Sequence, residues 1–380
     1  MKKKIYIFIT LALLTLAILP IINIHQNIVR DKKKTLYSVD YLLPYINHFF
    51  YFYGISTEPS QVIIGKNNWL YLVNTHATTD TPSDTNAKDL LDAQNIGLAT
   101  RAWEQWFRSK GIRNYKVIIG PDKNTIYPEY LPNGILPDVN SVTNNLLAYD
   151  KTGRYVDTRS ALKAAKTEFN TPLYYQTDSH WNNLGAWIAF RAFTNALAAE
   201  ESLQFLSDKD IHILNITERS GGDLANILRL NRFLVEHEVN VKIDTPSVIE
   251  TEQYDFETNV LNSSGDNPPI RARRHPLLVK SKNALNKKKV LWLRDSFGMA
   301  MSPYMAATFT QTLQIHYRVV DPALLTKLVE SFKPDYVFVT VVERSSREDF
   351  FMTLPPPSVT SKSAGVVEIR YYKGRANVLN

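Results

Sequence analysis

Three residue types in two short segments could together carry out acyl transfer. Ser296 lies in Leu291-Trp-Leu-Arg-Asp-Ser-Phe-Gly298, where an apolar run ends and a helix is expected over 299–309. A serine at a strand-to-helix turn exposes its hydroxyl beside the positive end of a helix and near unpaired backbone N–H groups. Asp178 and His180, two residues apart, offer a carboxylate and an imidazole. The two segments therefore contain the parts of a Ser-His-Asp triad.

In the expected reaction, His180 takes the proton from Ser296 as the hydroxyl attacks an acyl carbonyl, and Asp178 fixes the imidazole tautomer. The Ser296 N–H and a nearby side chain would stabilise the oxyanion. The candidates for oxyanion or substrate contacts are Lys123, Trp181, Asn182 and Arg344. Structural roles stay open for the same residues: a solvated surface lysine, a core aromatic, a helix N-cap, and an ion pair between Arg344 and Glu343.

Other chemistries fit the sequence less well. The chain has no cysteine, which excludes disulfides, thiolate metal sites and a cysteine nucleophile. Its eight histidines show no metal-binding spacing, and the phosphate-binding and dinucleotide-binding glycine motifs are absent. The G-x-S-x-G motif of ordinary α/β-hydrolases is also absent. We therefore expect neither a metal nor a cofactor.

Charge is distributed unevenly along the 380 residues. The formal net charge is +7, but residues 1–34 hold seven basic residues and one acidic residue, so the remainder is nearly neutral. This pattern argues against nucleic-acid binding. One segment, 271–289, contains eight lysines and arginines and no acidic residue. It is either a solvated turn or, if it borders the site, a feature that favours an anionic polymer.

The elements that must position the candidate residues alternate between strands and helices. Apolar runs predict buried strands at 115–119, 155–156, 290–293 and 336–342, and helical patterns follow at 93–110, 161–167, 326–332 and from Asn183 onward. This alternation indicates an α/β sandwich around a mainly parallel sheet. Functional groups gather beyond the carboxyl ends of such strands, so Ser296, Arg344 and the Asp178 loop could meet at one edge. Residues 205–285 break the rhythm and are predicted to form an insertion.

The N-terminus contains a candidate membrane anchor. Residues 5–22 are uncharged and mostly apolar, and as a helix they would span about 27 Å, close to a hydrocarbon core. We therefore expect residues 1–30 to form an anchor or uncleaved signal and 31–59 a juxtamembrane segment. The catalytic domain would cover 60–354, with a tail at 355–380. Basic residues flank the span on both sides, so charge leaves its orientation open.

Several segments in order resemble the AlgJ/AlgX-like family of polysaccharide O-acetyltransferases. They are Gly65-Lys-Asn-Asn-Trp-Leu-Tyr71, Pro121-Asp-Lys-Asn-Thr-Ile-Tyr-Pro128, Thr177-Asp-Ser-His-Trp-Asn182, Gly222-Asp-Leu-Ala225, Arg294-Asp-Ser-Phe-Gly298 and Val342-Glu-Arg344. The resemblance implies an SGNH-hydrolase-like three-layer α/β/α sandwich and a triad of Ser296, His180 and Asp178. Only 25 residues follow Pro355, too few for an added carbohydrate-binding module, so the chain is closer to the single-domain AlgJ type.

The resemblance also implies a function and a cellular setting. The expected activity is transfer of an acetyl group, through an acyl-serine, to hydroxyls of an exported polysaccharide. Its partner would be a membrane-bound O-acyltransferase that supplies acetyl groups. The chain would cross the bacterial inner membrane once, with its catalytic domain in the periplasm. Two alternatives stay open: a carbohydrate acetyl esterase with the same triad, and a non-catalytic polysaccharide-binding subunit of an export complex.

Overall fold

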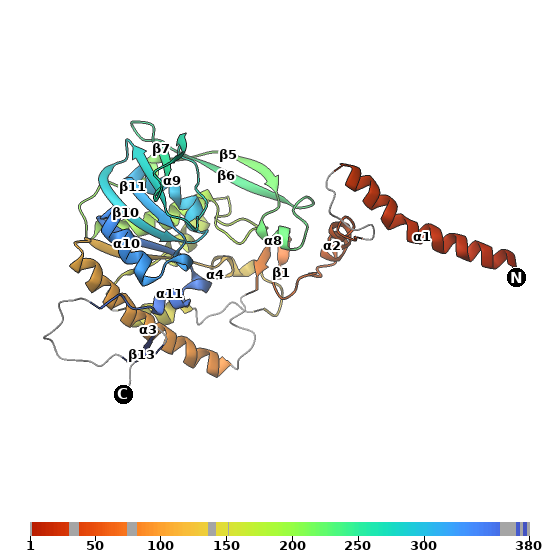
Figure 1. Cartoon of the computed structure of the whole chain (residues 1–380), viewed down its shortest axis with the longest axis horizontal. Coiled ribbons are helices and arrows are strands. Elements are labelled where there is room, and N and C mark those ends of the chain that lie inside the picture. The colour runs from red at the N-terminus through yellow and green to blue at the C-terminus, as the bar shows by residue number, and fades with distance from the viewer. Residues whose placement is uncertain are drawn as a thin grey trace.

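The globular part of the chain is built on an eight-stranded mixed sheet with the strand order β4-β3-β12-β10-β11-β9-β7-β8 (Figure 1). The computed structural model describes residues 2–29, 38–73, 82–135, 142–150, 152–357, 370–372 and 375–377. The first five strands of the sheet pair in parallel, and the last three join antiparallel. In sheet order the strands cover Tyr155–Asp157, Asn114–Gly120, Tyr336–Val342, Asn286–Arg294, Phe309–Ile315, Leu277–Lys282, Glu250–Asp255 and Leu261–Gly265.

The central strands are covered on both faces. All seven residues of β12 are buried, which is why its sequence is a continuous apolar run rather than an alternating one. Alternate side chains of β10 enter two different cores: Trp292 packs on one side of the sheet, and Leu291 and Leu293 pack on the other. The strand positions predicted from the apolar runs are therefore confirmed.

Two layers of helices cover the sheet. The first layer contributes Phe190, Phe193 and Met301 to the core around Trp292, and the second contributes Trp103 and Leu325 to the opposite core. The first consists of α6, α7 and α9, which cover Arg159–Glu168, Asn183–Ala198 and Gly298–Thr308. The second consists of α3, α5, α10 and α11, which cover Pro82–Ser109, Val142–Tyr149, Pro322–Phe332 and Asp349–Met352. The predicted α/β/α sandwich with a mainly parallel sheet is confirmed.

The largest difference from the predicted helix boundaries is at the start of α3. Helix α3 begins at Pro82 rather than near residue 93. Its early turns lack the apolar period because Ala87 and Lys88 face solvent, whereas Ala93 and Ile96 are buried. The apolar pattern therefore marked the point where α3 meets the sheet, not the point where the helix begins.

Residues 205–285 divide into two structural parts. Strands β5 (Ile211–Ser220) and β6 (Val235–Ile243) form a separate antiparallel ribbon, and α8 (Asp223–Ile227) lies between them in the chain. Strands β7, β8 and β9 instead extend the main sheet. Buried Val239 packs β6 against the core that contains α7. The ribbon is therefore fixed to the helical layer from which the candidate histidine loop emerges.

Short elements complete the described chain. Strands β1 (Val62–Ile64) and β2 (Leu70–Leu72) form a hairpin whose turn contains Asn67 with positive φ. Helix α4 covers Lys123–Ile126, directly after β3. Near the C-terminus, β13 (Arg370–Tyr372) pairs with β14 (Arg375–Asn377).

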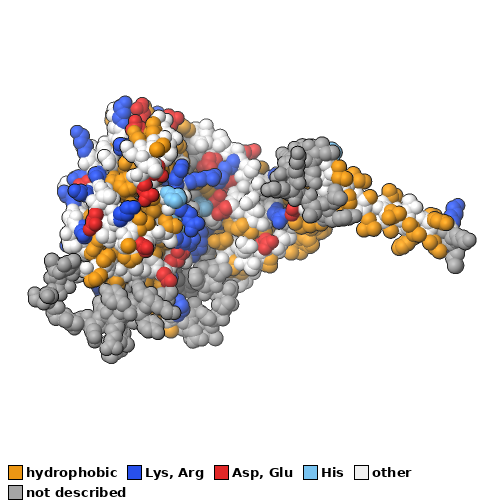
Figure 2. Space-filling view, viewed as in Figure 1, with side chains coloured by type: hydrophobic (Ala, Val, Ile, Leu, Met, Phe, Trp, Pro, Cys, Tyr) orange, Lys and Arg blue, Asp and Glu red, His pale blue; other side chains and the backbone are white. Residues whose placement is uncertain are grey.

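The N-terminal helix is long and apolar enough to cross a membrane. Helix α1 covers Lys2–Val29, and an 18-residue stretch within its segment Lys3–His25 has a mean hydropathy of 2.7. In Figure 1 it extends away from the globular part, and Figure 2 shows hydrophobic side chains along its length. Helix α2 (Leu43–Phe52) follows it, and its His48 stacks on Phe233 with ring centroids 4.6 Å apart. Phe52 is 79% exposed.

Candidate active site

Ser296 stands at the turn between β10 and α9, with its side chain exposed. The carboxylate of the preceding residue, Asp295, stabilises this turn through two hydrogen bonds. One oxygen of buried Asp295 accepts from the Phe297 N–H at 2.9 Å, and the other accepts from the Val342 N–H at 2.7 Å. These bonds tie the serine turn to the end of β12. This role of Asp295 was not predicted from the sequence, where its position beside Ser296 is the only sign of it.

Asp178 and His180 lie in the loop that leads into α7. Asp178 Oδ1 is 2.6 Å from His180 Nδ1 and also accepts from the His180 backbone N–H at 3.1 Å. The spacing of two residues allows both contacts from one carboxylate oxygen. The other oxygen accepts from the Asp223 N–H at 3.2 Å. A side chain on Gly222 would collide here, because its Cβ would lie 2.3 Å from Asp178 Cβ.

The structure brings the two segments together. His180 Nε2 lies 2.7 Å from Ser296 Oγ, so the carboxylate, imidazole and hydroxyl form one continuous line of hydrogen bonds. With Nδ1 donating to Asp178, Nε2 is left as the acceptor for the serine proton. This arrangement can activate the Ser296 hydroxyl as a nucleophile.

The Asp178–His180 pair sets the charge of the site. Burial works against an imidazolium, but the hydrogen bond and charge of Asp178, with a smaller effect of Asp223, outweigh it and raise the pKa of His180. Burial likewise works against the carboxylate, yet the hydrogen bond and charge of His180 hold the Asp178 pKa well below its usual range. Asp178 is therefore an anion at neutral pH and stabilises a protonated His180.

Lys123 is not a surface residue and does not point at Ser296. Its side chain is buried, and Nζ donates to the carbonyl oxygens of Tyr175, Gln176 and Asp178 at 3.0, 2.9 and 2.8 Å. The three bonds use the donors of one ammonium group on the loop that carries the candidate acid and base. The structure therefore gives Lys123 a positioning role instead of the oxyanion or substrate contact that the sequence suggested.

Trp181 and Asn182 also serve the framework. Trp181 is 1% exposed, and its indole donates to the Phe297 carbonyl at 3.0 Å. Asn182 is the N-cap of α7, since its side chain accepts from the Gly185 N–H at 3.0 Å. The structural alternatives considered for both residues match these positions, and neither side chain is directed at the serine hydroxyl.

Arg344 lies beside the site, but its ion-pair partner is Asp122 rather than Glu343. Its guanidinium lies 5.7 Å from the centre of the Phe297 ring, and its charge opposes protonation of His180. Glu343 instead accepts from the Thr125 hydroxyl at 2.7 Å and from the Asp122 N–H at 3.1 Å. The carboxylates of Asp122 and Glu343 thus hold the loops after β3 and β12 together. Arg344 remains a candidate for contact with the oxyanion.

Asp223 adds a second carboxylate beside the candidate histidine. It accepts from the Ser179 N–H at 2.7 Å and from the Ser179 hydroxyl at 2.6 Å, and its Oδ2 lies 3.6 Å from His180 Nδ1. With Asp178 and His180 it forms a group whose ligand atoms lie within 4.8 Å of one another. These atoms already take part in the hydrogen bonds described above, so the group is explained without a metal.

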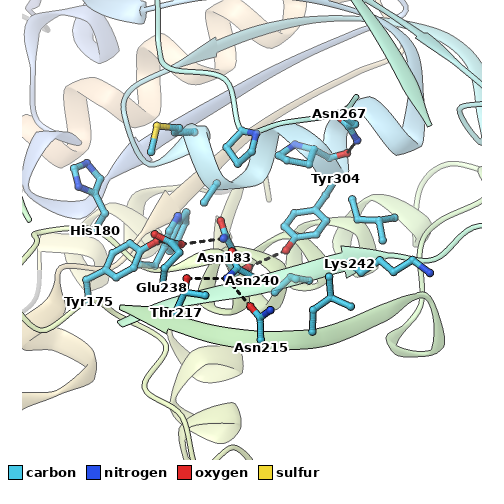
Figure 3. A pocket seen from close by; sticks show the side chains of 18 of the residues that line it. Tyr175, His180, Asn183, Asn215, Thr217, Glu238, Asn240, Lys242, Asn267 and Tyr304 are labelled. Carbon is cyan, nitrogen blue, oxygen red and sulfur yellow. Dashed lines mark hydrogen bonds between the residues drawn. The ribbon is translucent and has the colours of Figure 1, made fainter. Parts of the chain in front are cut away.

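A cleft of about 880 Å³ opens at the Ser296–His180 pair and continues between α9 and the β5–β6 ribbon. Figure 3 shows His180 at one end and Lys242 toward the other, with Tyr304 descending from the helix and Asn240 rising from the ribbon. The exposed hydroxyl of Ser296 is therefore accessible from a cavity large enough for an extended ligand.

Comparison with known proteins identifies one family and several related folds. The family described as SGNH hydrolase-like domain, acetyltransferase AlgX, matches residues 62–260. This range contains Asp178 and His180 but ends before Ser296. Comparison with curated protein sequences found no match.

Among solved structures, Bacillus cereus PatB1 with a sulfonyl adduct is 15% identical with a TM-score of 0.55, covering 77% of this chain and 98% of that one. A DHHW family protein from Eubacterium siraeum is 17% identical with a TM-score of 0.53, covering 78% and 100%. The O-acetyltransferase domain of Pseudomonas putida AlgJ is 15% identical with a TM-score of 0.46, covering 77% and 93%. At these identities the first two support the fold.

Because Lys123 positions its loop, we expect Lys123→Met to have a lower free energy of unfolding than the wild type, by an amount that depends on pH. The substitution removes the Nζ donor from the carbonyls of Tyr175 and Asp178, while the Gln176 carbonyl keeps the Leu70 N–H at 2.8 Å, and it should lower the free energy of unfolding by about 1–3 kcal/mol. Burial lowers the pKa of Lys123 to about 7, against an ordinary value of 10.5. Between these values the unfolded chain binds the extra proton, so this lysine makes stability rise with pH.

Urea unfolding of the wild type and Lys123→Met at pH 6.5 to 9.5 measures both effects. The difference between the two proteins isolates Lys123 from other titrating groups. Identical pH slopes would contradict the assignment.

Proposed function

Because the chain belongs to the SGNH hydrolase-like acetyltransferase family of AlgX, we propose that it is a polysaccharide O-acetyltransferase that uses Ser296, His180 and Asp178 as a catalytic triad. The observation that carries the proposal is the line of hydrogen bonds from Asp178 through His180 to Ser296 at the mouth of a large cleft. It supports serine activation in a part of the chain that the family match does not reach.

The first half-reaction moves the acetyl group to the enzyme. The Ser296 oxygen attacks the acetyl carbonyl carbon of an ester donor, and His180 Nε2 takes the hydroxyl proton. Collapse of the tetrahedral intermediate breaks the bond to the donor oxygen, and His180 returns the proton to that leaving alcohol. The products are acetyl-Ser296 and the free alcohol, with His180 neutral again.

The second half-reaction mirrors the first. A sugar hydroxyl in the cleft loses its proton to His180 as its oxygen attacks the acetyl-Ser296 carbonyl. The bond to the Ser296 oxygen then breaks, and His180 reprotonates the serine. Transfer dominates over hydrolysis when the bound sugar places its hydroxyl where water would otherwise attack.

In both half-reactions, groups at the turn that carries Ser296 stabilise the oxyanion of the tetrahedral intermediate. The first donor that we assign to the oxyanion is the Ser296 N–H. Within the described part of the chain, it donates no hydrogen bond to another group. Arg344 is the side-chain candidate because its guanidinium lies against Phe297, the residue that follows the serine. Donors of this kind contribute about 3–4 kcal/mol to transition-state stabilisation.

We also propose that α1 anchors the chain in the bacterial inner membrane with the catalytic domain in the periplasm. The apolar length of α1 supports a membrane span, and the exposed aromatic side chains of α2 suit the membrane–water interface. A membrane-bound O-acyltransferase would supply the acetyl group, because a periplasmic enzyme has no access to cytoplasmic acetyl donors.

The first test concerns the nucleophile. Ser296→Ala should lower acetyl transfer from a small acetyl ester to an oligosaccharide by at least about 10³-fold. Because the side chain is exposed, the free energy of unfolding should change by less than about 0.5 kcal/mol. Ser263→Ala, an exposed serine on β8, is the matched control and should behave as the wild type.

Mass spectrometry of the sugar, together with acetate release, distinguishes the candidate activities. Ser296-dependent acetate release without acetylated sugar would identify an esterase. Undiminished polysaccharide acetylation by Ser296→Ala in cells would instead identify a non-catalytic subunit.

The second test uses the pH dependence of the reaction. The base must be neutral, so kcat/KM should rise as pH increases through the raised pKa of His180. Asp178→Asn removes the charge that raises this pKa, while the burial that lowers it stays. We therefore expect the midpoint of the pH profile of kcat/KM to move to lower pH in this variant. Its kcat/KM should also fall by about 10³- to 10⁴-fold. An unchanged midpoint in a folded variant would exclude Asp178 as the partner of His180.

The third test concerns the membrane, and the absence of cysteine makes single labels unique. A spin label on Phe52→Cys of the full chain in liposomes should collide more with lipid-soluble oxygen than with a polar nickel complex. Lys209→Cys, an exposed position on the globular part, should show the reverse.

An impermeant maleimide should also label Lys209→Cys in cells whose outer membrane is permeabilised. Equal oxygen access at both positions would contradict the interfacial placement of α2, and protection of position 209 would contradict the proposed orientation.

A further inference from the structure

The cleft extends far beyond the reacting hydroxyl, and its walls differ in character. Helix α9 provides Met299, Pro303 and the aromatic ring of Tyr304 on one side, and Tyr175 adds a second ring near His180. The β5–β6 ribbon provides the other wall (Figure 3). The ribbon wall mixes polar side chains with Leu214, Val241 and Ile243. Apolar surface beside polar groups suits a sugar chain, whose rings present C–H faces and whose edges carry hydroxyls.

The charged residues in this lining already neutralise one another. Arg219 Nε lies 3.2 Å from Glu238 Oε2, and its guanidinium stacks on Tyr175 at 4.3 Å. Lys242 Nζ lies 2.7 Å from Asp244 Oδ1. Among the described lining residues these two cations stand against three carboxylates, Asp178, Glu238 and Asp244. An anionic ligand would therefore meet occupied cations and a small excess of negative charge.

The remaining polar groups of the lining are amides and hydroxyls. Asn240 donates from Nδ2 to Asn215 Oδ1 at 2.7 Å and to Thr217 Oγ1 at 3.0 Å. Its carbonyl oxygen is left to accept a hydrogen bond from a ligand. Such an acceptor matches hydroxyl donors, which an uncharged sugar supplies in excess.

The basic segment 271–289 does not line the cleft. It lies on and around β9 and β10, where several of its lysine side chains have local partners. Lys280 lies 4.3 Å from the Tyr254 ring, Lys282 pairs with Glu250 at 3.2 Å, and Lys288 pairs with Asp335 at 3.1 Å. The segment that would favour an anionic polymer is therefore not part of the cleft lining.

We propose, on the basis of the function proposed above, that the acceptor is an uncharged, hydroxyl-rich polysaccharide rather than a polymer of uronic acids. The paired charges of the cleft and the free acceptor of Asn240 carry this inference. A polyuronate would have to displace Glu238 or Asp244 from its cation, and each displaced carboxylate would then face the polymer's own charges. An uncharged glycan binds without breaking either pair.

In the test, the full chain in detergent is incubated with 4-nitrophenyl acetate as the acetyl donor and with one of two acceptors of equal length. One acceptor is a hexasaccharide of β-linked glucose, and the other is a hexasaccharide of β-linked mannuronate. Acetylated sugar is measured by mass spectrometry over a range of acceptor concentrations. We expect kcat/KM for the neutral acceptor to exceed that for the uronate by at least about tenfold. Raising NaCl from ~0.05 to ~0.5 M should change the neutral value by less than about twofold.

Two variants sharpen this comparison. Asp244→Asn releases Lys242 from its partner, so it should raise the kcat/KM of the uronate several-fold relative to that of glucose. The double variant Lys280→Gln with Lys282→Gln changes the basic segment outside the cleft and should leave the ratio as in the wild type.

The results separate failure of this inference from failure of the proposed function. Ser296-dependent transfer that favours the uronate, or treats both acceptors equally, overturns the inference and leaves the function standing. Loss of uronate transfer in the double variant Lys280→Gln with Lys282→Gln would also overturn the inference and leave the proposed function standing. Ester cleavage that does not depend on Ser296, or that never acetylates either sugar, overturns the proposed transferase and the inference with it.

Discussion

The alignment of His180 with Ser296 depends on one hydrogen bond, from the Trp181 indole to the Phe297 carbonyl. It joins the residue after the histidine to the residue after the serine, across 116 positions of sequence. Gly120 makes room for this junction, because a Cβ there would lie 2.6 Å from Phe297 Cδ1 and 3.0 Å from Trp181 Cη2. Trp181 and Phe297 are both almost fully buried, so the core of the protein fixes the distance between imidazole and hydroxyl.

Buried ionisable groups support the irregular backbone around that junction. Asp295 accepts from the Val342 N–H, Lys123 donates to the Asp178 carbonyl, and Glu236 accepts from the Thr177 N–H at 2.7 Å. A charged group can serve several backbone partners at once, which suits tight turns near a reacting centre. The charges that shape the site therefore include several that never touch a substrate.

The sequence was most informative where burial is uniform. The run at 336–342 coincides with β12, and the Asp-x-His spacing accommodates the contact of one carboxylate oxygen with both the ring and the backbone of His180. Lys123 could not be assigned, since its three acceptors belong to a loop more than 50 residues away. The sequence did not reveal the ribbon either, because its strands carry many polar residues and β5 is almost entirely exposed, so the pattern resembles a loop until β5 and β6 pair.

The arrangement of α1 and α2 limits where the enzyme can act. With α1 in a bilayer, as proposed, the 13 residues that separate the two helices span at most about 45 Å when fully extended. The catalytic domain is then confined to a thin layer of periplasm, at a high effective concentration toward anything that emerges from the same membrane. A glycan chain would receive its acetyl groups near its exit point, and segments that had already moved outward would escape modification. The pattern of acetylation along the finished polymer would thus record the speed of its export.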